Sequence, residues 1–103
     1  MTVLWFGTKR SGETLKLSFD FAADLATGET LSTPVVAASV YGGSDPTPSG
    51  ILSGSPAVSG SLVTQLVTGG LDHVTYQLVF QATTSNSQIL QGVSLLPVSN
   101  KVE

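Results

Sequence analysis

The sequence contains no cysteine, and only 11% of its residues are charged. The missing cysteines exclude disulfides, thiolate metal sites and cysteine nucleophiles, and they favour folding in a reducing cytoplasm. Ordinary domains carry about 25% charged residues, so the surface of this protein is poor in charge. Ser and Thr make up 26 of the 103 residues, and these small hydroxyl side chains lose little entropy when another surface covers them.

The charge that is present is weakly negative, with a formal net charge of −3. Nucleic-acid binding requires a basic stripe, and the four basic residues lie only near the two chain ends, so a nucleic-acid partner is not expected. The longest apolar runs are far shorter than the roughly 18 residues of a membrane-spanning helix. The first residues also lack the basic leader and long apolar core of a secretory signal. We expect no membrane partner.

A strict alternation of apolar and polar residues dominates one stretch, from Gly69 to Ser87. Val74, Tyr76 and Leu78 begin a row that continues through Phe80 and Ala82, with polar residues between. This period of two predicts a strand buried on one face. The segment 14–21 alternates in the same way around Leu15, Leu17, Phe19 and Phe21.

The remaining segments read as shorter strands separated by turns. Residues 33–41 are apolar on both faces, which predicts a central strand or a subunit contact, with Pro34 near the strand start or at an edge. Further strands are expected at 57–59, 61–68 and 88–98. In the last of these, Gly92 suggests a bulge and Pro97 the end of pairing. Residues 22–26 form at most one helical turn.

About seven short strands with regular turn signals indicate an all-β, antiparallel β-sandwich. Immunoglobulin-like sandwiches place a tyrosine corner near the start of the sixth strand, with an inward residue two positions later. Asp72, Tyr76 and Leu78 fit that spacing, with Leu78 in place of the antibody cysteine, so we expect a disulfide-free immunoglobulin-like fold. The Tyr76 hydroxyl should bond a backbone group a few residues upstream. A closed barrel is the less favoured alternative.

The domain organisation follows from these elements. Residues 1–13 form either a first strand at a sheet edge or an arm that docks on a neighbour, residues 14–98 form the sandwich, and residues 99–103 form a polar tail. Trp5 and Phe6 are candidate contact residues, because aromatic anchors are common at interfaces. The loop from Gly42 to Gly50 has almost nothing to bury, which makes Asp45, Pro46 and Pro48 further contact candidates.

The sequence offers no catalytic, cofactor or metal constellation. The single histidine, His73, lies in a turn beside Asp72, and we expect it to be exposed to solvent rather than catalytic. The acidic residues Asp20, Asp24 and Glu29 lack calcium-loop spacing and suit turns and caps instead. No glycine-rich phosphate loop or zinc spacing is present. We therefore predict a protein that is not an enzyme and has no cofactor.

Two stretches resemble small structural proteins of tailed bacteriophages. The first is the turn Leu25-Ala26-Thr27-Gly28-Glu29-Thr30-Leu31-Ser32, and the second is TGGLDHVTYQLVFQATTSNSQIL at 68–90. The chain departs from the pattern at Asp24, where tryptophan is frequent, and at Asn86, where glycine is frequent. The resemblance spans about Leu15 to Leu96 and implies an immunoglobulin-like virion component without enzymatic activity.

The leading functional hypothesis is a capsid decoration protein that binds the assembled phage head. The alternative is a neck or tail fibre domain, or a module that recognises a cell or a glycan. In either case the partners would be capsid or other virion proteins. The chain would act as a homo-oligomer or in many symmetry-related copies, in a virion made in the bacterial cytoplasm. A hydrolase ranks far behind, because no catalytic constellation exists.

Overall fold

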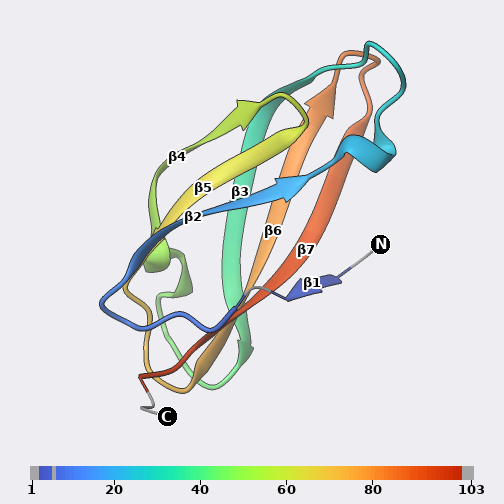
Figure 1. The fold of residues 1–103 in the computed structure, drawn as a ribbon. Coiled ribbons are helices and arrows are strands. Elements are labelled where there is room, and N and C mark those ends of the chain that lie inside the picture. Colours follow the sequence, from blue (N-terminus) through green and yellow to red (C-terminus); the bar gives the residue numbers. More distant parts are fainter. Residues whose placement is uncertain (1–2, 6, 101–103) are drawn as a thin grey trace.

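The computed structural model describes residues 3–5 and 7–100, which form an elongated body of 45 × 23 × 19 Å (Figure 1). These residues contain strands and two single turns of 3-10 helix, and no helix among them is long and apolar enough to cross a membrane. The elements are β1 (Val3–Trp5), β2 (Thr14–Asp20), η1 (Ala22–Asp24), β3 (Leu31–Gly42), η2 (Pro48–Ile51), β4 (Leu52–Ser59), β5 (Leu62–Thr68), β6 (Val74–Thr84) and β7 (Ile89–Val98).

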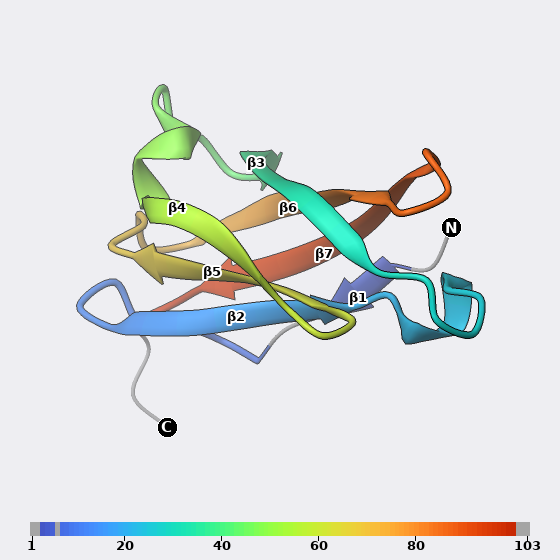
Figure 2. The ribbon, with the colours of Figure 1, turned by 90° about the horizontal axis from the view of Figure 1, so that it is seen from above.

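The strands form two layers that pack face to face (Figure 2). One sheet has the order β1-β7-β6-β3, the other β2-β5-β4. Every pair is antiparallel except β1 with β7. Immunoglobulin domains divide their strands in the same way, with β2, β4 and β5 in one sheet and β3, β6 and β7 in the other. The difference is that β1 pairs with β7 here, whereas the first strand of a constant-type domain belongs to the sheet of the second. The predicted disulfide-free immunoglobulin-like sandwich is confirmed.

The core is built on the inner face of β6, the strand whose alternation is clearest in the sequence. Its inward side chains are at most 4% exposed, while the residues between them face outward. Both neighbours of β6 pair with it along most of its length. Because one face of β6 packs against the opposite sheet and the other face points outward, the alternating pattern was sufficient to predict this element.

The aromatic side chains of the opposite sheet complete the core. The ring centroids of Phe19 and Phe80 are 5.9 Å apart, and those of Phe19 and Phe21 are 4.9 Å apart. Phe19 also lies over Gly92 of β7, where any Cβ atom would overlap the ring. The register of β6 with β7 runs without a shift, so the bulge predicted at Gly92 was wrong. Glycine is required there by the close approach of Phe19.

Pairing of β7 also continues further than predicted. Pro97 lies opposite Thr75 and Val98 opposite Val74, so the proline does not end the ladder. Beyond Pro97, the Lys9 N–H donates to its carbonyl at 2.9 Å, and the His73 N–H donates to the Val98 carbonyl at 3.0 Å. The Pro97 carbonyl therefore points away from β6, and so does its nitrogen, so the ladder with β6 loses no hydrogen bond to the proline.

The strand β3 occupies an edge of the larger sheet, not its centre. Pro34 lies near its start, at a register shift between Ser32 and Val35, where Thr33 has φ 50°. Leu31 at the start of β3 is buried, but the inward side chains further along, such as Val36, are only half-buried, and those that point outward are exposed. Of the two alternatives predicted for this segment, the central strand was wrong, because apolar residues on both faces do not distinguish a flanked strand from an exposed edge, and the subunit contact stays a prediction.

The strand β4 begins at Leu52, five residues before the predicted Ala57. Its register with β5 shifts between Ser53 and Ala57, around Gly54 and Pro56. The buried amide of Gln65 fills this irregularity, because its Nε2 donates to the Ser53 carbonyl at 3.0 Å. The sequence around β4 does not show that the Gln65 side chain supplies hydrogen bonds there, so the first part of the strand was not predicted.

Candidate interaction surface

A buried tyrosine fastens two loops at one end of the sandwich. Tyr76 is fully buried at the start of β6. The Leu71 N–H, five residues upstream, donates to the Tyr76 hydroxyl oxygen at 2.9 Å. The same hydroxyl donates to Oδ2 of Asp45 at 2.6 Å. The upstream backbone bond is the arrangement of a tyrosine corner. The bond to Asp45 adds a second loop, the one between β3 and β4.

The shared proton stays on the tyrosine. Burial raises the pKa of Tyr76, and the hydrogen bond to Asp45 raises it further. The same hydrogen bond lowers the pKa of Asp45, with help from the Thr47 N–H, which donates to Oδ1 at 2.9 Å. Asp45 is therefore a charged acceptor, and a charge-assisted bond is stronger than a neutral one.

This bond changes the role of the predicted contact loop. Asp45 turns inward and fixes the loop to the core, so its carboxylate already has partners. Pro48 begins η2 and is half-buried, while Pro46 is exposed. Of these three candidates, Pro46 is the one whose side chain the structure leaves open to solvent.

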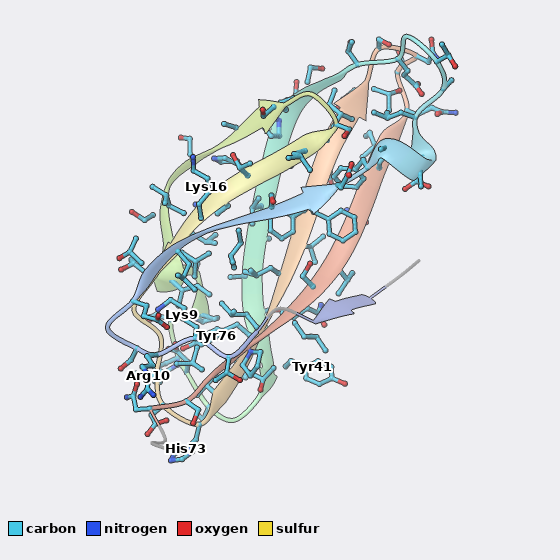
Figure 3. The ribbon with its side chains drawn as sticks, viewed as in Figure 1. Lys9, Arg10, Lys16, Tyr41, His73 and Tyr76 are labelled. Carbon is cyan, nitrogen blue, oxygen red and sulfur yellow. The ribbon has the colours of Figure 1, made fainter. Side chains whose placement is uncertain are left out.

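A second buried polar residue, Lys9, lies at the same end as Tyr76 and His73 (Figure 3). Its Nζ donates to the carbonyls of Gly69 at 2.7 Å and Arg10 at 2.8 Å. Loss of hydration lowers the pKa of the Lys9 ammonium. Lys9 thus fixes the segment before β2 against the Gly-Gly turn before β6. Nothing in its local sequence distinguishes it from a surface lysine.

Asp72 and His73 lie in the same turn. Asp72 accepts the Asn100 N–H at 2.9 Å, which ties the turn to the segment after β7. The His73 side chain is 81% exposed and lies 3.4 Å from the Asp72 carboxylate. His73 has φ 67°, the left-handed conformation of a turn residue. Leu78, the third residue of the predicted corner, is fully buried.

The acidic residues at the other end act as local acceptors. Asp20 accepts the Ser61 hydroxyl at 2.7 Å and the Ala22 N–H at 2.8 Å, and these bonds lower its pKa. Glu29 accepts the Ala26 N–H at 2.9 Å, which lowers its pKa in the same way. Within residues 7–100 no group of three or more His, Asp or Glu side chains is arranged to hold a metal ion.

The outer face of the larger sheet carries no charge. The strands β3, β6 and β7 contain no Asp, Glu, Lys or Arg at all. Three of the outward residues, Val35, Tyr41 and Ile89, are 46%, 60% and 64% exposed. Leu95 also points outward but is only 3% exposed. We call this surface the neutral face; its outward residues that are at least partly exposed are Val35, Ala37, Ser39, Tyr41, Thr75, Gln77, Val79, Gln81, Thr83, Ile89, Gln91, Val93 and Pro97.

The smaller sheet has a different outer face. Lys16 and Asp20 lie on it, beside hydroxyl side chains and the 43% exposed Leu66. Covering a charge with a partner requires its desolvation, whereas neutral hydroxyl, amide and aliphatic groups are covered at lower cost. The neutral face is therefore the surface of the sandwich that a protein partner covers most readily.

Fold and surface together define the class of the protein, a small immunoglobulin-like β-sandwich with one uncharged outer face. The comparison with protein families identifies the family more closely. Residues 9–97 match the family described as podophage GP4 fiber-tail adaptor protein gp77, and the chain belongs to that family. No curated protein matches the sequence.

Membership makes the chain a structural protein of a bacteriophage virion, non-enzymatic in kind. It also implies that the chain binds other virion proteins. The family concerns the tail, so it favours a neck or tail component over the capsid decoration protein that was the leading hypothesis from the sequence.

The N-terminal candidates are placed only in part. Trp5 ends β1, which pairs with β7 of the same chain at the sheet edge, and Phe6 lies outside the described residues. A role of either residue at an interface stays a prediction.

Proposed function

We propose that this chain is an adaptor of the podophage tail, which joins a fibre to the tail body. The observation that carries the proposal is the family match over residues 9–97. The match spans the sequence from Lys9 to Pro97, including both loops that Tyr76 fastens.

The structure supplies the properties that an adaptor needs. A rigid sandwich keeps its two long faces in a fixed relation, and the hydrogen bonds of Tyr76 and Lys9 hold the connecting loops at one end. The neutral face offers a surface that is covered at low desolvation cost. Several copies arranged in symmetry would add avidity to a weak single contact, so we propose a multi-copy arrangement on the particle.

The proposal is tested with phage in which the gene for this chain is interrupted. We expect particles with normal, DNA-filled heads and tails that lack at least one type of fibre. Adding the purified protein, with fibre protein, to these particles should restore the fibres. Fibres that remain on particles without the chain would contradict the proposal, as would a defect confined to head stability, which would return the protein to the class of capsid decoration.

A further inference from the structure

The sandwich has four strand edges, and three of them carry features that prevent pairing with another chain. Within the described residues, the strand β1 covers only the three residues Val3–Trp5. The edge of β2 carries Lys16 and Asp20. The edge of β4 is broken by its register shift around Gly54 and Pro56. Short edges, charges, prolines and bulges are the means by which proteins keep edge strands from pairing.

The fourth edge, that of β3, lacks these features along its middle. Pro34 and a register shift lie before Val35, and a second shift lies between Val40 and Gly42. Between them, Val35–Val40 pairs with β6 in unbroken register and contains no charge, proline or glycine. Among the described residues no strand pairs with the other side of this run.

Burial shows that the sandwich is open along this edge. The inward residues Val36, Ala38 and Val40 are only half-buried, although their partners on β6 are fully buried. Val35, on the outward side, is 46% exposed. Such an uncharged, regular edge is a template for a further strand and a hazard when it stays uncovered.

We propose that the edge Val35–Val40 binds an extended, uncharged segment of another virion protein, which adds a fifth strand to the larger sheet. The unpaired backbone groups of an edge are complemented by another strand, which supplies both donors and acceptors in register. The run measures about 20 Å, the length of an average strand. Apolar or small side chains of the segment lie beside Val35 and Ala37 on the neutral face. The choice of a virion partner rests on the proposed adaptor function.

A second copy of β3 fits this edge less well than an unrelated segment. Two copies of β3 would pair as antiparallel strands related by a two-fold axis. Residues that lie opposite each other in such a pair point to the same face of the sheet, so the axis has to pass beside one residue that lies opposite its own copy. The centre of the six-residue run falls between Ala37 and Ala38. An axis at Ala37 places Val40 opposite Pro34, which has no N–H, and an axis at Ala38 brings the second register shift into the ladder. A segment from another protein is free of this restriction.

The first test compares hydrogen exchange in the purified full chain and in intact phage particles. Peptides that cover residues 31–42 should exchange at least about tenfold more slowly in the particle than in the free chain. The added strand protects the backbone amides of β3 that point away from β6. Peptides from β2 should change much less. Equal exchange of 31–42 in both states would overturn the proposal. Protection already present in the free chain and lost on dilution would show a second copy as the occupant, which also overturns it.

The second test uses a matched pair of substitutions. Ser39 on β3 and Ser59 on β4 are both exposed serines on edge strands, and Ser59 belongs to the other sheet and lies outside the neutral face. Ser39→Lys should reduce incorporation of the chain into fibre-bearing particles by about tenfold or more with an unchanged melting temperature, because a lysine on the edge opposes strand addition. Ser59→Lys should incorporate normally. Equal loss with both variants would mean that an added charge on either edge impairs incorporation, which contradicts the proposal, and no loss with either would also contradict it.

The two proposals fail in different ways. If the fibres depend on this chain but residues 31–42 exchange as fast in the particle as in the free protein, the adaptor function is supported and strand addition is contradicted. Particles whose fibres do not depend on the chain overturn the adaptor function, whatever the exchange of β3.

Discussion

The adjacent strands β6 and β3 have similarly apolar sequences and opposite roles. Both are long, and they pair over most of their length. β6 lies between two strands, and its inward side chains are at most 4% exposed. β3 has one neighbour, and its inward side chains from Val36 to Val40 are only half-buried. The difference indicates that β6 specifies the fold, whereas β3 contributes less to stability and is available for binding.

The largest expected effect separates the two strands directly. Leu78 of β6 and Ala38 of β3 are opposed in register, and Val36 is one of the two larger residues nearest to Ala38 on the same inner side of β3. Leu78→Ala should lower the free energy of unfolding by about 2–5 kcal/mol, because a fully buried side chain leaves a cavity. Val36→Ala should cost about 1 kcal/mol, because its side chain is already half-exposed. Denaturant unfolding measures both, and equal costs would remove the distinction between the strands.

Gly92 tests the packing between the sheets. Gly92→Ala places a methyl group on the ring of Phe19 and should displace that ring from its stack with Phe80. Overpacking of this kind costs about 1–3 kcal/mol. Replacing Phe19 with leucine in the same chain should recover part of the loss. Thermal unfolding of the single and double variants decides the matter, and an undiminished stability of Gly92→Ala would show that the ring has room to move.

Tyr76→Phe removes both hydrogen bonds of the tyrosine hydroxyl while keeping the buried ring. The Leu71 N–H then loses its acceptor and the Asp45 carboxylate loses its strongest donor. We expect a loss of about 1–2 kcal/mol in the free energy of unfolding. Amides of the loop between β3 and β4 should also exchange faster, because that loop loses its bond to the core. An unfolding midpoint equal to that of the original chain would argue against the tyrosine corner.

Acid should destabilise the protein through Asp45, Asp20 and Glu29. Hydrogen bonds lower the pKa of each in the folded state, whereas unfolding returns them to ordinary values of 3.8 for Asp and 4.5 for Glu. The unfolded chain therefore binds protons first as pH falls, so stability is full above these ordinary values and is lost as pH falls through the lowered ones.

Asp45→Asn should make this acid dependence shallower, and Tyr76→Phe should do the same, because the tyrosine hydroxyl is the main cause of the low pKa of Asp45. Urea unfolding between pH 2 and pH 6 would measure the slopes. Identical slopes in all three proteins would mean that Asp45 titrates alike in the folded and unfolded chains.

The smallest effect is expected at Ser94, on the inner side of β7. Its hydroxyl is fully buried and has no hydrogen-bond partner among the described residues. Replacing this hydroxyl removes no hydrogen bond, and it removes a buried polar group that has lost its hydration. Ser94→Ala should therefore change the free energy of unfolding by less than about 0.5 kcal/mol or raise it. A loss of more than about 1 kcal/mol would indicate a partner for this hydroxyl.

The sequence predicted the strands in which successive side chains alternate between the core and the outer face. The alternation in β2 and β6 identified both strands and the inward row that includes Tyr76 and Leu78. The spacing from Asp72 to Leu78 indicated the corner and the immunoglobulin-like fold. These signals are local, because side chains of one strand alternate regardless of what the strand pairs with.

Features that depend on distant partners could not be read from the sequence. The edge position of β3, the room that Gly92 makes for Phe19, and the burial of Lys9 are all set by segments far apart in the chain. The bond from Tyr76 to Asp45 joins residues 31 positions apart. The same limit applied to function, because charge-poor composition predicted a covered surface without indicating which part of the virion covers it.

The most direct measurement is an image of the phage particle at a resolution that traces individual strands. Our account predicts that the sandwich lies at the junction of a fibre with the tail body, with an extended segment of another virion protein paired along Val35–Val40. A position on the head surface would contradict the adaptor function. A position at the junction with β3 open to solvent would contradict the role of its edge in binding.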